Sequence, residues 1–196
     1  LSRYTFNSLF PDTVYCHESG GAPEAIPDLK YEDFLKYHRE YYHPSNSYIY
    51  MYGDMDTCER LKYLDEEYLS DFLAEDVDIK ADIPLQKAFD KPLYETKPYA
   101  ITEDESLADN TYLSYNVVTG TSVDAKLYLA LQILDYALVM TPGAPLKQAL
   151  IDAGISTDVY SSLETSLYQP VYSIIAKNAN EKDRDDFVRI IENKLS

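Results

Sequence analysis

Apolar and aromatic side chains recur at helical spacing in residues 31–42, which predicts a helix there. The side chains that share its apolar face are Phe34, Leu35, His38, Tyr41 and Tyr42. Pro44 ends this helix, because the residue before a proline avoids the α conformation. Residues 47–52 form a run of aromatic and β-branched side chains, which predicts a strand. Asp56 then begins a second helix as the cap residue of an Asp-x-x-Glu capping box.

From residue 94 onward, strand and helix patterns follow one another in the order β-β-α-α-β-β-α. Strands are predicted at 94–102, 111–118, 155–164 and 170–177, and helices at 123–140, from Pro145 to Gly154, and after Asn180 as a cap. The side chains expected to face the core are Leu127, Leu131, Leu134 and Leu138 in the long helix, and Phe187, Ile190 and Ile191 in the last one. Because hairpin-like pairs dominate this order, it predicts an α+β fold with an antiparallel sheet packed by helices.

The periodic pattern is lost between residues 76 and 93, where acidic residues, Pro84 and Pro92 interrupt it. Such a composition is typical of a linker that runs over a surface. We therefore expect three parts: a first unit at residues 1–75, a linker at 76–93 and a second unit at 94–196. The first ten residues have the pattern of the final turns of a helix.

The acidic composition narrows the range of partners. The formal net charge of −17 repels phosphate backbones and anionic headgroups, so we expect neither a nucleic-acid nor a membrane partner. No apolar run approaches the ~20 residues that a membrane span needs. Where the charge lines a cavity it favours basic peptides, and elsewhere it serves solubility. The two cysteines, Cys16 and Cys58, lack CxxC spacing, which favours a reducing compartment.

The three histidines, His17, His38 and His43, lack the spacing of a metal site. A metallopeptidase helix binds its metal through two histidines four residues apart, which share one face. His38 and His43 are five apart, which separates them by about 140° around an ideal helix. We therefore predict that His38 is a core residue and that His43 caps the end of a helix, rather than that either binds a metal. We assign no metal ligand and no catalytic residue, because the neighbouring Cys16 and His17 are poorly placed to act on each other.

A glycine-rich loop, Ser-Gly-Gly-Ala-Pro, occupies residues 19–23. It has neither the Lys-Ser/Thr of a phosphate-binding loop nor G-x-G-x-x-G spacing. Glycines allow the backbone of such a loop to approach another group closely. The sequence leaves two interpretations open for the group that this loop approaches: a packed neighbour within the protein or an extended peptide. If that group is a peptide, then Ser19, Gly20 and Gly21 are substrate-binding residues.

A longer pattern surrounds this loop. It consists of Leu9-Phe10-Pro11-Asp12-Thr13, Ser19-Gly20-Gly21-x-Pro23, Ile26-Pro27-x-Leu29, Tyr41-Tyr42-His43-Pro44-Ser45-Asn46-Ser47 and Tyr52-Gly53-Asp54. It closely resembles the insulinase-like (M16) zinc metallopeptidases, in particular their presequence-protease branch. Residues 142–154, which begin Pro-Gly-Ala-Pro-Leu, resemble the same branch. Lys30 departs from the pattern, since relatives usually have a Thr or Ser cap there.

The resemblance implies an organisation for the whole protein. Such peptidases have four homologous α+β domains, in two halves that close around a peptide. The first domain binds zinc through an inverted His-x-x-Glu-His helix and a more distant Glu, which precede the Ser-Gly-Gly loop and would here lie before Leu1. Residues 1–75 would be the C-terminal part of that first domain, and residues 94–196 most of the second, non-zinc-binding domain. Zinc is therefore expected in the parent enzyme and not in this chain.

Two functions follow as expectations. The first is a non-catalytic portion of a zinc-dependent metalloendopeptidase that degrades peptides in a closed chamber, with Ser19, Gly20 and Gly21 in the cleft. Its partners would be the remainder of the same polypeptide and unfolded or basic peptides. The alternative is a free-standing peptide-binding or scaffold module without enzymatic activity. We expect a cytoplasmic protein, bacterial in origin, and self-association if the sheet edge at 47–52 is exposed.

Overall fold

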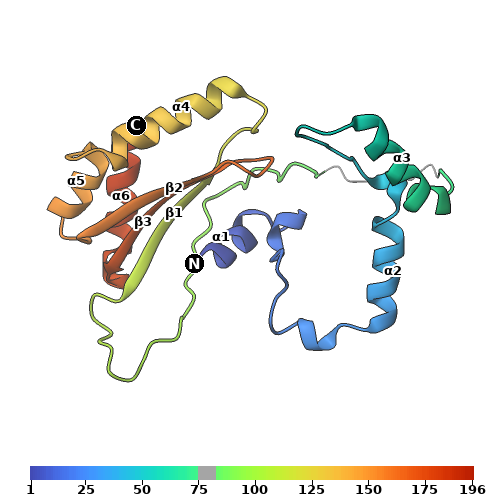
Figure 1. Ribbon diagram of the computed structural model, residues 1–196. Coiled ribbons are helices and arrows are strands. Elements are labelled where there is room, and N and C mark those ends of the chain that lie inside the picture. The colour runs from blue at the N-terminus through green and yellow to red at the C-terminus, as the bar shows by residue number, and fades with distance from the viewer. Residues whose placement is uncertain (75–82) are drawn as a thin grey trace. The chain divides into compact units, whose positions relative to one another are not determined.

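The computed structural model describes residues 1–74 and 83–196 of the chain. Contacts between residues divide the chain into two compact units. The first consists of Leu1–His17 together with Ile83–Ser196, and the second consists of Glu18–Asp82. The helices and strands of both units are labelled in Figure 1.

The first unit is built on an antiparallel sheet with the strand order β1-β3-β2. The strands are β1 (Thr111–Val118), β2 (Asp158–Glu164) and β3 (Val171–Ala179). The central strand β3 pairs its Ile175 with Ser114 of β1 and with Tyr160 of β2. The three predicted strands at these positions and the predicted α+β class are confirmed.

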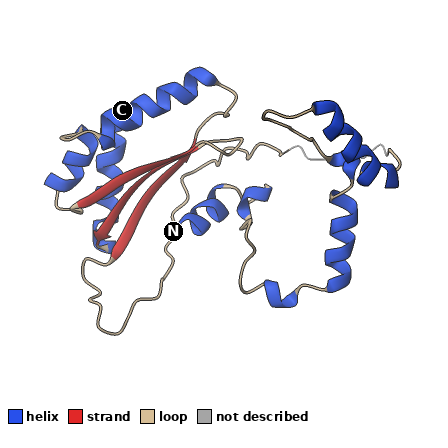
Figure 2. Cartoon of the chain, viewed as in Figure 1, coloured by secondary structure: helices blue, strands red, loops and turns tan. Residues whose placement is uncertain are grey.

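Helices pack against this sheet (Figure 2). They are α4 (Ala125–Asp135), the π-helix η5 (Tyr136–Met140), α5 (Pro145–Asp152) and α6 (Arg184–Leu195), which follows the 3-10 turn η6 (Glu181–Asp183). Pro145 begins α5, since its missing N–H is not needed in the first turn of a helix. Gly154 follows α5 with φ +71°, a conformation that favours glycine. The predicted helices are therefore confirmed.

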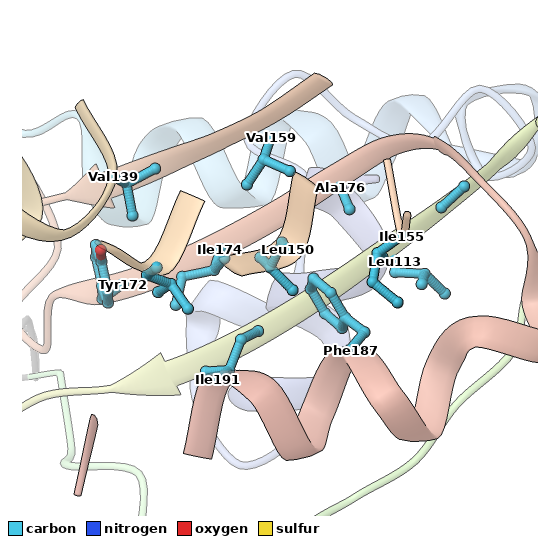
Figure 3. Close-up of a cluster of buried hydrophobic side chains, with 12 residues drawn as sticks. Leu113, Val139, Leu150, Ile155, Val159, Tyr172, Ile174, Ala176, Phe187 and Ile191 are labelled. Carbon is cyan, nitrogen blue, oxygen red and sulfur yellow. The ribbon is translucent and has the colours of Figure 1, made fainter. Parts of the chain in front are cut away.

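Side chains from the sheet and its helices form one hydrophobic core (Figure 3). Its buried members are Leu113, Val139, Leu146, Leu150, Ile155, Val159, Tyr172, Ile174, Ala176, Ala179, Phe187 and Ile191. Burying a side chain of the size of leucine or phenylalanine contributes about 1.5–3 kcal/mol, so this cluster holds the helices on the sheet. The predicted core positions Phe187 and Ile191 are confirmed, and Ile190 packs against the cluster while partly buried.

The N-terminal segment belongs to this unit through a buried glutamine. It contains α1 (Ser2–Leu9) and the 3-10 turn η1 (Val14–Cys16). The Gln86 side chain accepts a hydrogen bond from the Asp12 N–H (3.0 Å) and donates one to the Asp12 carboxylate (2.8 Å). The backbone N–H of Gln86 donates to Gln169 Oε1, between β2 and β3, at 2.6 Å. Gln86 therefore connects the segment after α1 to the β2–β3 loop.

In its described residues, 18–74, the second unit contains two α-helices and short 3-10 turns. They are η2 (Ile26–Asp28), α2 (Tyr31–Tyr41), η3 (Pro44–Asn46), α3 (Thr57–Glu67) and η4 (Leu69–Asp71). Both α-helices were predicted, and Asp56 caps α3 by accepting a hydrogen bond from the Glu59 N–H at 3.0 Å. Neither helix contains a buried residue, and Phe34 and Leu61 of the predicted apolar faces are exposed.

Two predicted strands are wrong. Residues 47–52 and 94–102 belong to no strand in this structure. Their side chains suit a strand, but a strand also needs a second segment to pair with its backbone N–H and C=O groups. Within the described residues neither segment has such a partner.

Two details of the predicted helices also need correction. Of the four leucines predicted to face the core, Leu138 packs against it while partly buried, Leu127 and Leu131 are half-buried, and Leu134 is exposed. The prediction assumed regular heptad spacing, whereas the buried side chains Asp135 and Val139 are four residues apart and the helix ends in the π turn η5. Asn180 does not cap the last helix. Its side chain bonds to Asp109, whose φ of +54° it stabilises by accepting from the Asp109 N–H at 3.1 Å.

The predicted linker lies partly outside the described residues, which omit 75–82. Its remaining part, residues 83–93, has no helix or strand and contains the buried Gln86. The predicted division into 1–75, 76–93 and 94–196 concerns the domains of a parent protein and stays a prediction.

The sequence analysis expected no segment apolar enough to cross a membrane, and one helical stretch contradicts this. By length and composition alone, Ala125–Asp152 is long and apolar enough to cross a membrane, and the mean hydropathy of its most apolar window is 1.3. A turn at residues 141–144 divides it into α4 with η5, and α5. Leu146 and Leu150 of α5 are fully buried in the core, whereas only 17% of the most apolar window of the stretch is buried.

Candidate functional site

The predicted substrate-binding residues Ser19, Gly20 and Gly21 lie together in an exposed turn of the second unit. The Gly21 N–H donates to the Glu18 carbonyl at 3.0 Å and closes the turn. All three residues are exposed, so their backbone is accessible to a ligand. Their role in binding substrate stays a prediction.

The backbone conformation explains only one of the two glycines of this turn. Gly21 has φ +86°, a conformation that side chains other than glycine rarely adopt. A Cβ atom at Gly21 would also lie 3.4 Å from Ile26. Gly20 has no positive φ, and a Cβ atom there would meet no described atom within 4 Å. The fold therefore accounts for a glycine at position 21 but not at position 20, where the backbone faces open space.

The histidines are placed differently from their predictions. His38 is exposed and stacks on Tyr42 with ring centroids 4.8 Å apart, so the predicted core position is wrong. The core prediction assumed that the apolar face of α2 is covered, which it is not within the described residues. His43 does act as a cap, but at the beginning of η3, where its Nδ1 accepts from the Ser45 N–H at 3.2 Å.

The zinc ion that the resemblance implies does not fit the residues described here. In residues 1–74 and 83–196, no group of three or more His, Cys, Asp or Glu side chains could hold a metal ion. Cys16 and Cys58 are free thiols. We therefore derive no chemical step through a metal in this chain.

A buried polar cluster beneath the end of α4 was missed from the sequence. Asp135 of α4 and Tyr172 of β3 are buried, at 8% and 6% exposed, close to Ser161 of β2. Among the described residues, Asp135 Oδ1, Ser161 Oγ and Tyr172 Oη are buried without a hydrogen-bond partner. The signal that could have revealed the cluster is an aspartate on the inner face of an otherwise apolar helix.

Electrostatics determine what this cluster can do. Burial first, and then the neighbouring Asp135 carboxylate, raises the pKa of Tyr172 well above its usual value of 10.0. Tyr172 is therefore a neutral hydroxyl at physiological pH, suited to donate a hydrogen bond and unsuited to act as a base. The cluster adjoins η5, and π turns are frequent at functional positions of helices.

A shallow depression of about 280 Å³ lies on the outer side of α6. Its lining residues are Tyr94, Arg184, Asp185, Val188, Arg189 and Glu192. Arg184 lies over the Tyr94 ring at 5.9 Å and pairs with Asp185, and Arg189 pairs with Asp186 at 2.6 Å. Both guanidinium groups are already engaged, so the depression is not a strong anion site.

Comparison with known families identifies the class of protein. Residues 28–196 match the family described as "Peptidase M16 inactive domain". This match covers most of the chain, and the chain belongs to the M16 peptidase family. The resemblance noted in the sequence is thereby confirmed.

Individual relatives narrow the comparison. Over 195 residues, 100% of this chain, it is 40% identical to Protein HypA of Clostridium perfringens, of which it covers 20%. It is 34% identical over 197 residues to Presequence protease 1, chloroplastic/mitochondrial, of Arabidopsis thaliana, of which it covers 18%. It is 30% identical over 203 residues to the mitochondrial presequence protease of Xenopus tropicalis, of which it covers 19%. The chain thus spans about a fifth of the length of these curated relatives.

Proposed function

We propose that this chain is a non-catalytic portion of a zinc-dependent metalloendopeptidase that degrades peptides in a closed chamber. The observation that carries the proposal is the match of residues 28–196 to the M16 domain described as inactive. Similarity to two presequence proteases along the whole chain supports a peptidase as the parent. In this proposal zinc is bound by the parent enzyme outside this chain, which supplies surface rather than chemistry.

The glycine turn is the part of this chain that we propose to contact substrate. Ser19, Gly20 and Gly21 are exposed, and the open space at Gly20 gives an extended peptide access to the backbone. Backbone N–H and C=O groups bind an extended peptide without regard to its side chains. The net charge of −17 favours unfolded or basic peptides over acidic ones.

The proposal is tested by comparing the full-length parent protein with the isolated chain. We expect the parent to contain zinc and to cleave an unstructured basic peptide, and to lose that activity on treatment with a chelator. We expect the isolated chain to contain no zinc after dialysis and to cleave nothing. Zinc bound stoichiometrically by the isolated chain, or a parent without peptidase activity, would contradict the proposal. The second result would favour the alternative, a peptide-binding or scaffold module.

Location and self-association are further parts of the proposal. A bacterial cytoplasmic protein is supported by 40% identity to a Clostridium protein and by the free thiols of Cys16 and Cys58. The alternative is an organelle, since other relatives are named mitochondrial or chloroplastic. Cell fractionation distinguishes these locations.

Self-association through residues 47–52 stays a prediction, and sedimentation equilibrium of the isolated chain tests it.

A further inference from the structure

The segment from Leu127 to Met140, which comprises most of α4 and the π turn η5, is apolar around its whole circumference. Asp135 is its one charged residue, and Gln132 is its one amide. A helix that is apolar all round offers no single hydrophobic face. Burial of apolar area therefore does not by itself determine how this helix is rotated about its axis on the sheet.

The leucines of this segment indicate one possible orientation. Four of them follow heptad spacing, namely Leu127, Leu131, Leu134 and Leu138. On an ideal helix their common direction lies about 70° around the axis from the direction of Asp135. With these leucines turned to the sheet, Asp135 would lie at the margin of the packed face, where a carboxylate reaches water.

The structure has a different orientation. Asp135 is only 8% exposed, and Val139, four residues further on, lies in the core at 1% exposed (Figure 3). Leu134, in contrast, is 42% exposed. The outer side carries an apolar stripe with helical spacing, whose members are each more than half exposed: Leu129, Ile133, Tyr136 and Met140. The fold thus buries a carboxylate and exposes a leucine, which is the reverse of what transfer from water favours for both groups.

The polar groups beneath α4 account for this orientation. Ser161 of β2 and Tyr172 of β3 lie close to Asp135, and buried oxygen atoms of all three are without a hydrogen-bond partner among the described residues. After burial, the nearby Asp135 carboxylate is the next cause of the raised pKa of Tyr172. Attraction between a carboxylate and a hydroxyl dipole is strong in a low-dielectric interior. In the other orientation leucines would cover both hydroxyl groups and offer them no polar neighbour, which costs free energy.

We propose that Asp135 determines the rotation of α4 on the sheet, because its carboxylate is attracted to the hydroxyl groups of Ser161 and Tyr172. Asp135 is a positioning residue, which selects one of two packings that apolar burial distinguishes poorly. A single buried polar residue can fix the register of a helix in this way. The rotation in turn places the stripe that contains Ile133 on the outer side. This inference concerns the chain alone, so its failure would leave the proposed peptidase function untouched.

Thiol labelling of single introduced cysteines measures the rotation in the 196-residue chain. Val139→Cys reports on a position that is buried and would turn outward, whereas Ala130→Cys reports on an exposed position that would turn toward the sheet. Ile133→Cys is the control position, because it lies on the outer side in both orientations. Peptide mass spectrometry separates the introduced thiols from Cys16 and Cys58.

Asp135→Leu is the variant that removes the positioning group. We expect labelling to become about tenfold faster at Val139→Cys and about threefold slower at Ala130→Cys, with no change at Ile133→Cys. These opposite changes are specific to a rotation, because a general loosening of α4 would accelerate labelling at both positions. We expect the urea midpoint to stay the same or to rise, since replacing a buried charged group by an apolar one is often neutral or stabilising.

Asp135→Asn and Asp152→Leu are the matched control variants. The asparagine amide has the shape of the carboxylate and still bonds to hydroxyl groups, so we expect the original labelling rates in Asp135→Asn. Asp152→Leu makes the same chemical change at an exposed aspartate of α5 and should also preserve the rates. Opposite changes at the two reporter positions in Asp152→Leu would show a general response to lost charge and would overturn the inference.

A second variant provides the test if Asp135→Leu shows no cooperative unfolding. The double variant Ser161→Ala, Tyr172→Phe keeps the carboxylate but removes the two hydroxyl groups that attract it. We expect the same opposite changes in labelling as in Asp135→Leu. In either variant that folds, unchanged labelling at Val139→Cys and Ala130→Cys would overturn the inference, as would faster labelling at both.

Discussion

Tyr172 lies in the core with its hydroxyl group buried and without a hydrogen bond among the described residues (Figure 3). Burial and the Asp135 carboxylate raise its pKa above the 10.0 of an ordinary tyrosine. In the folded chain it therefore keeps its proton at a pH at which the unfolded chain has released it. The contribution of Tyr172 to stability is fully present below about pH 10 and is lost as the pH rises toward its higher folded pKa.

Tyr172→Phe tests this assignment. We expect the free energy of unfolding of the variant at about pH 8 to lie within about 1 kcal/mol of the original, because the hydroxyl lies near Asp135 and Ser161 without reaching hydrogen-bond geometry with either. Between about pH 8 and pH 11 the variant should lose less stability than the original chain, since it has one buried ionisable group fewer. Chemical denaturation at both pH values measures the two differences. Tyr48→Phe, on a fully exposed ring, is the control and should behave like the original at both.

Gly20 is the residue whose substitution tests the proposed cleft most directly. A Cβ atom at this position would meet none of the described atoms within 4 Å, and Gly20 is exposed, so Gly20→Leu should leave the midpoint of thermal unfolding unchanged. In the full-length parent we expect the same variant to lower kcat/KM for a peptide about tenfold, the effect of losing about 1.4 kcal/mol of binding. Peptide turnover measures this effect. Gly20→Ala should have a smaller effect, and unchanged turnover in Gly20→Leu would remove this turn from the substrate site.

At the scale of elements, the helices of the two units depend on different forces. α5 and α6 are held by burial of side chains such as Leu150 and Phe187 against the sheet. α2 and α3 bury no residue, so within the described chain they depend on caps and local hydrogen bonds. Isolated helices of about this length are marginal in water. The second unit is therefore expected to be the less stable of the two.

Leu150→Ala measures how much the core of the first unit contributes. Leu150 is fully buried between α5 and the sheet, so the variant should lose about 2–5 kcal/mol of unfolding free energy through lost burial and a cavity. Ile133→Ala is the matched control on the outer side of α4, where the side chain is 70% exposed, and should cost less than about 0.5 kcal/mol. Urea denaturation monitored by circular dichroism compares the two. Equal losses would mean that the outer side of α4 is covered.

At the scale of the whole molecule, the contacts do not follow the order of the chain. Residues 1–17 pack with residues 83–196, and residues 18–82 form the other unit. The Gln86 side chain is one of the contacts behind this arrangement, since its amide bonds to Asp12 while its backbone bonds to Gln169. A side-chain amide satisfied on both its C=O and its NH2 group is costly to replace by an apolar group of similar size.

Gln86→Leu should therefore loosen the N-terminal segment. Loss of the side chain leaves the Asp12 N–H without its acceptor, and we expect a cost of about 1–3 kcal/mol. Hydrogen exchange of residues 10–16 should rise, while exchange of β3 should stay unchanged. Gln148→Leu is the control, because the Gln148 amide is exposed and, among the described residues, bonds to Asp152 alone, in the next turn of the same helix. Increased exchange in both variants would show that the contact with Asp12 is not responsible.

The sequence by itself determined the elements whose signals are local, and the family. The α2 periodicity, the Asp56 cap, Pro145 at the start of α5 and the apolar runs of β1 and β3 each depend on residues a few positions apart. The fold class followed from their order, and the motifs around the Ser-Gly-Gly loop were dense enough to indicate the M16 family.

Only the tertiary structure decided which of these segments have partners. Residues 47–52 have the composition of a strand, yet no described segment pairs with them, because pairing depends on a second segment that a local pattern does not specify. His38 was expected in the core and is exposed for the same reason, since burial depends on what covers a face. Gln86, Asp135 and Tyr172 had no local signal, because their environments are assembled from residues that are distant in the sequence.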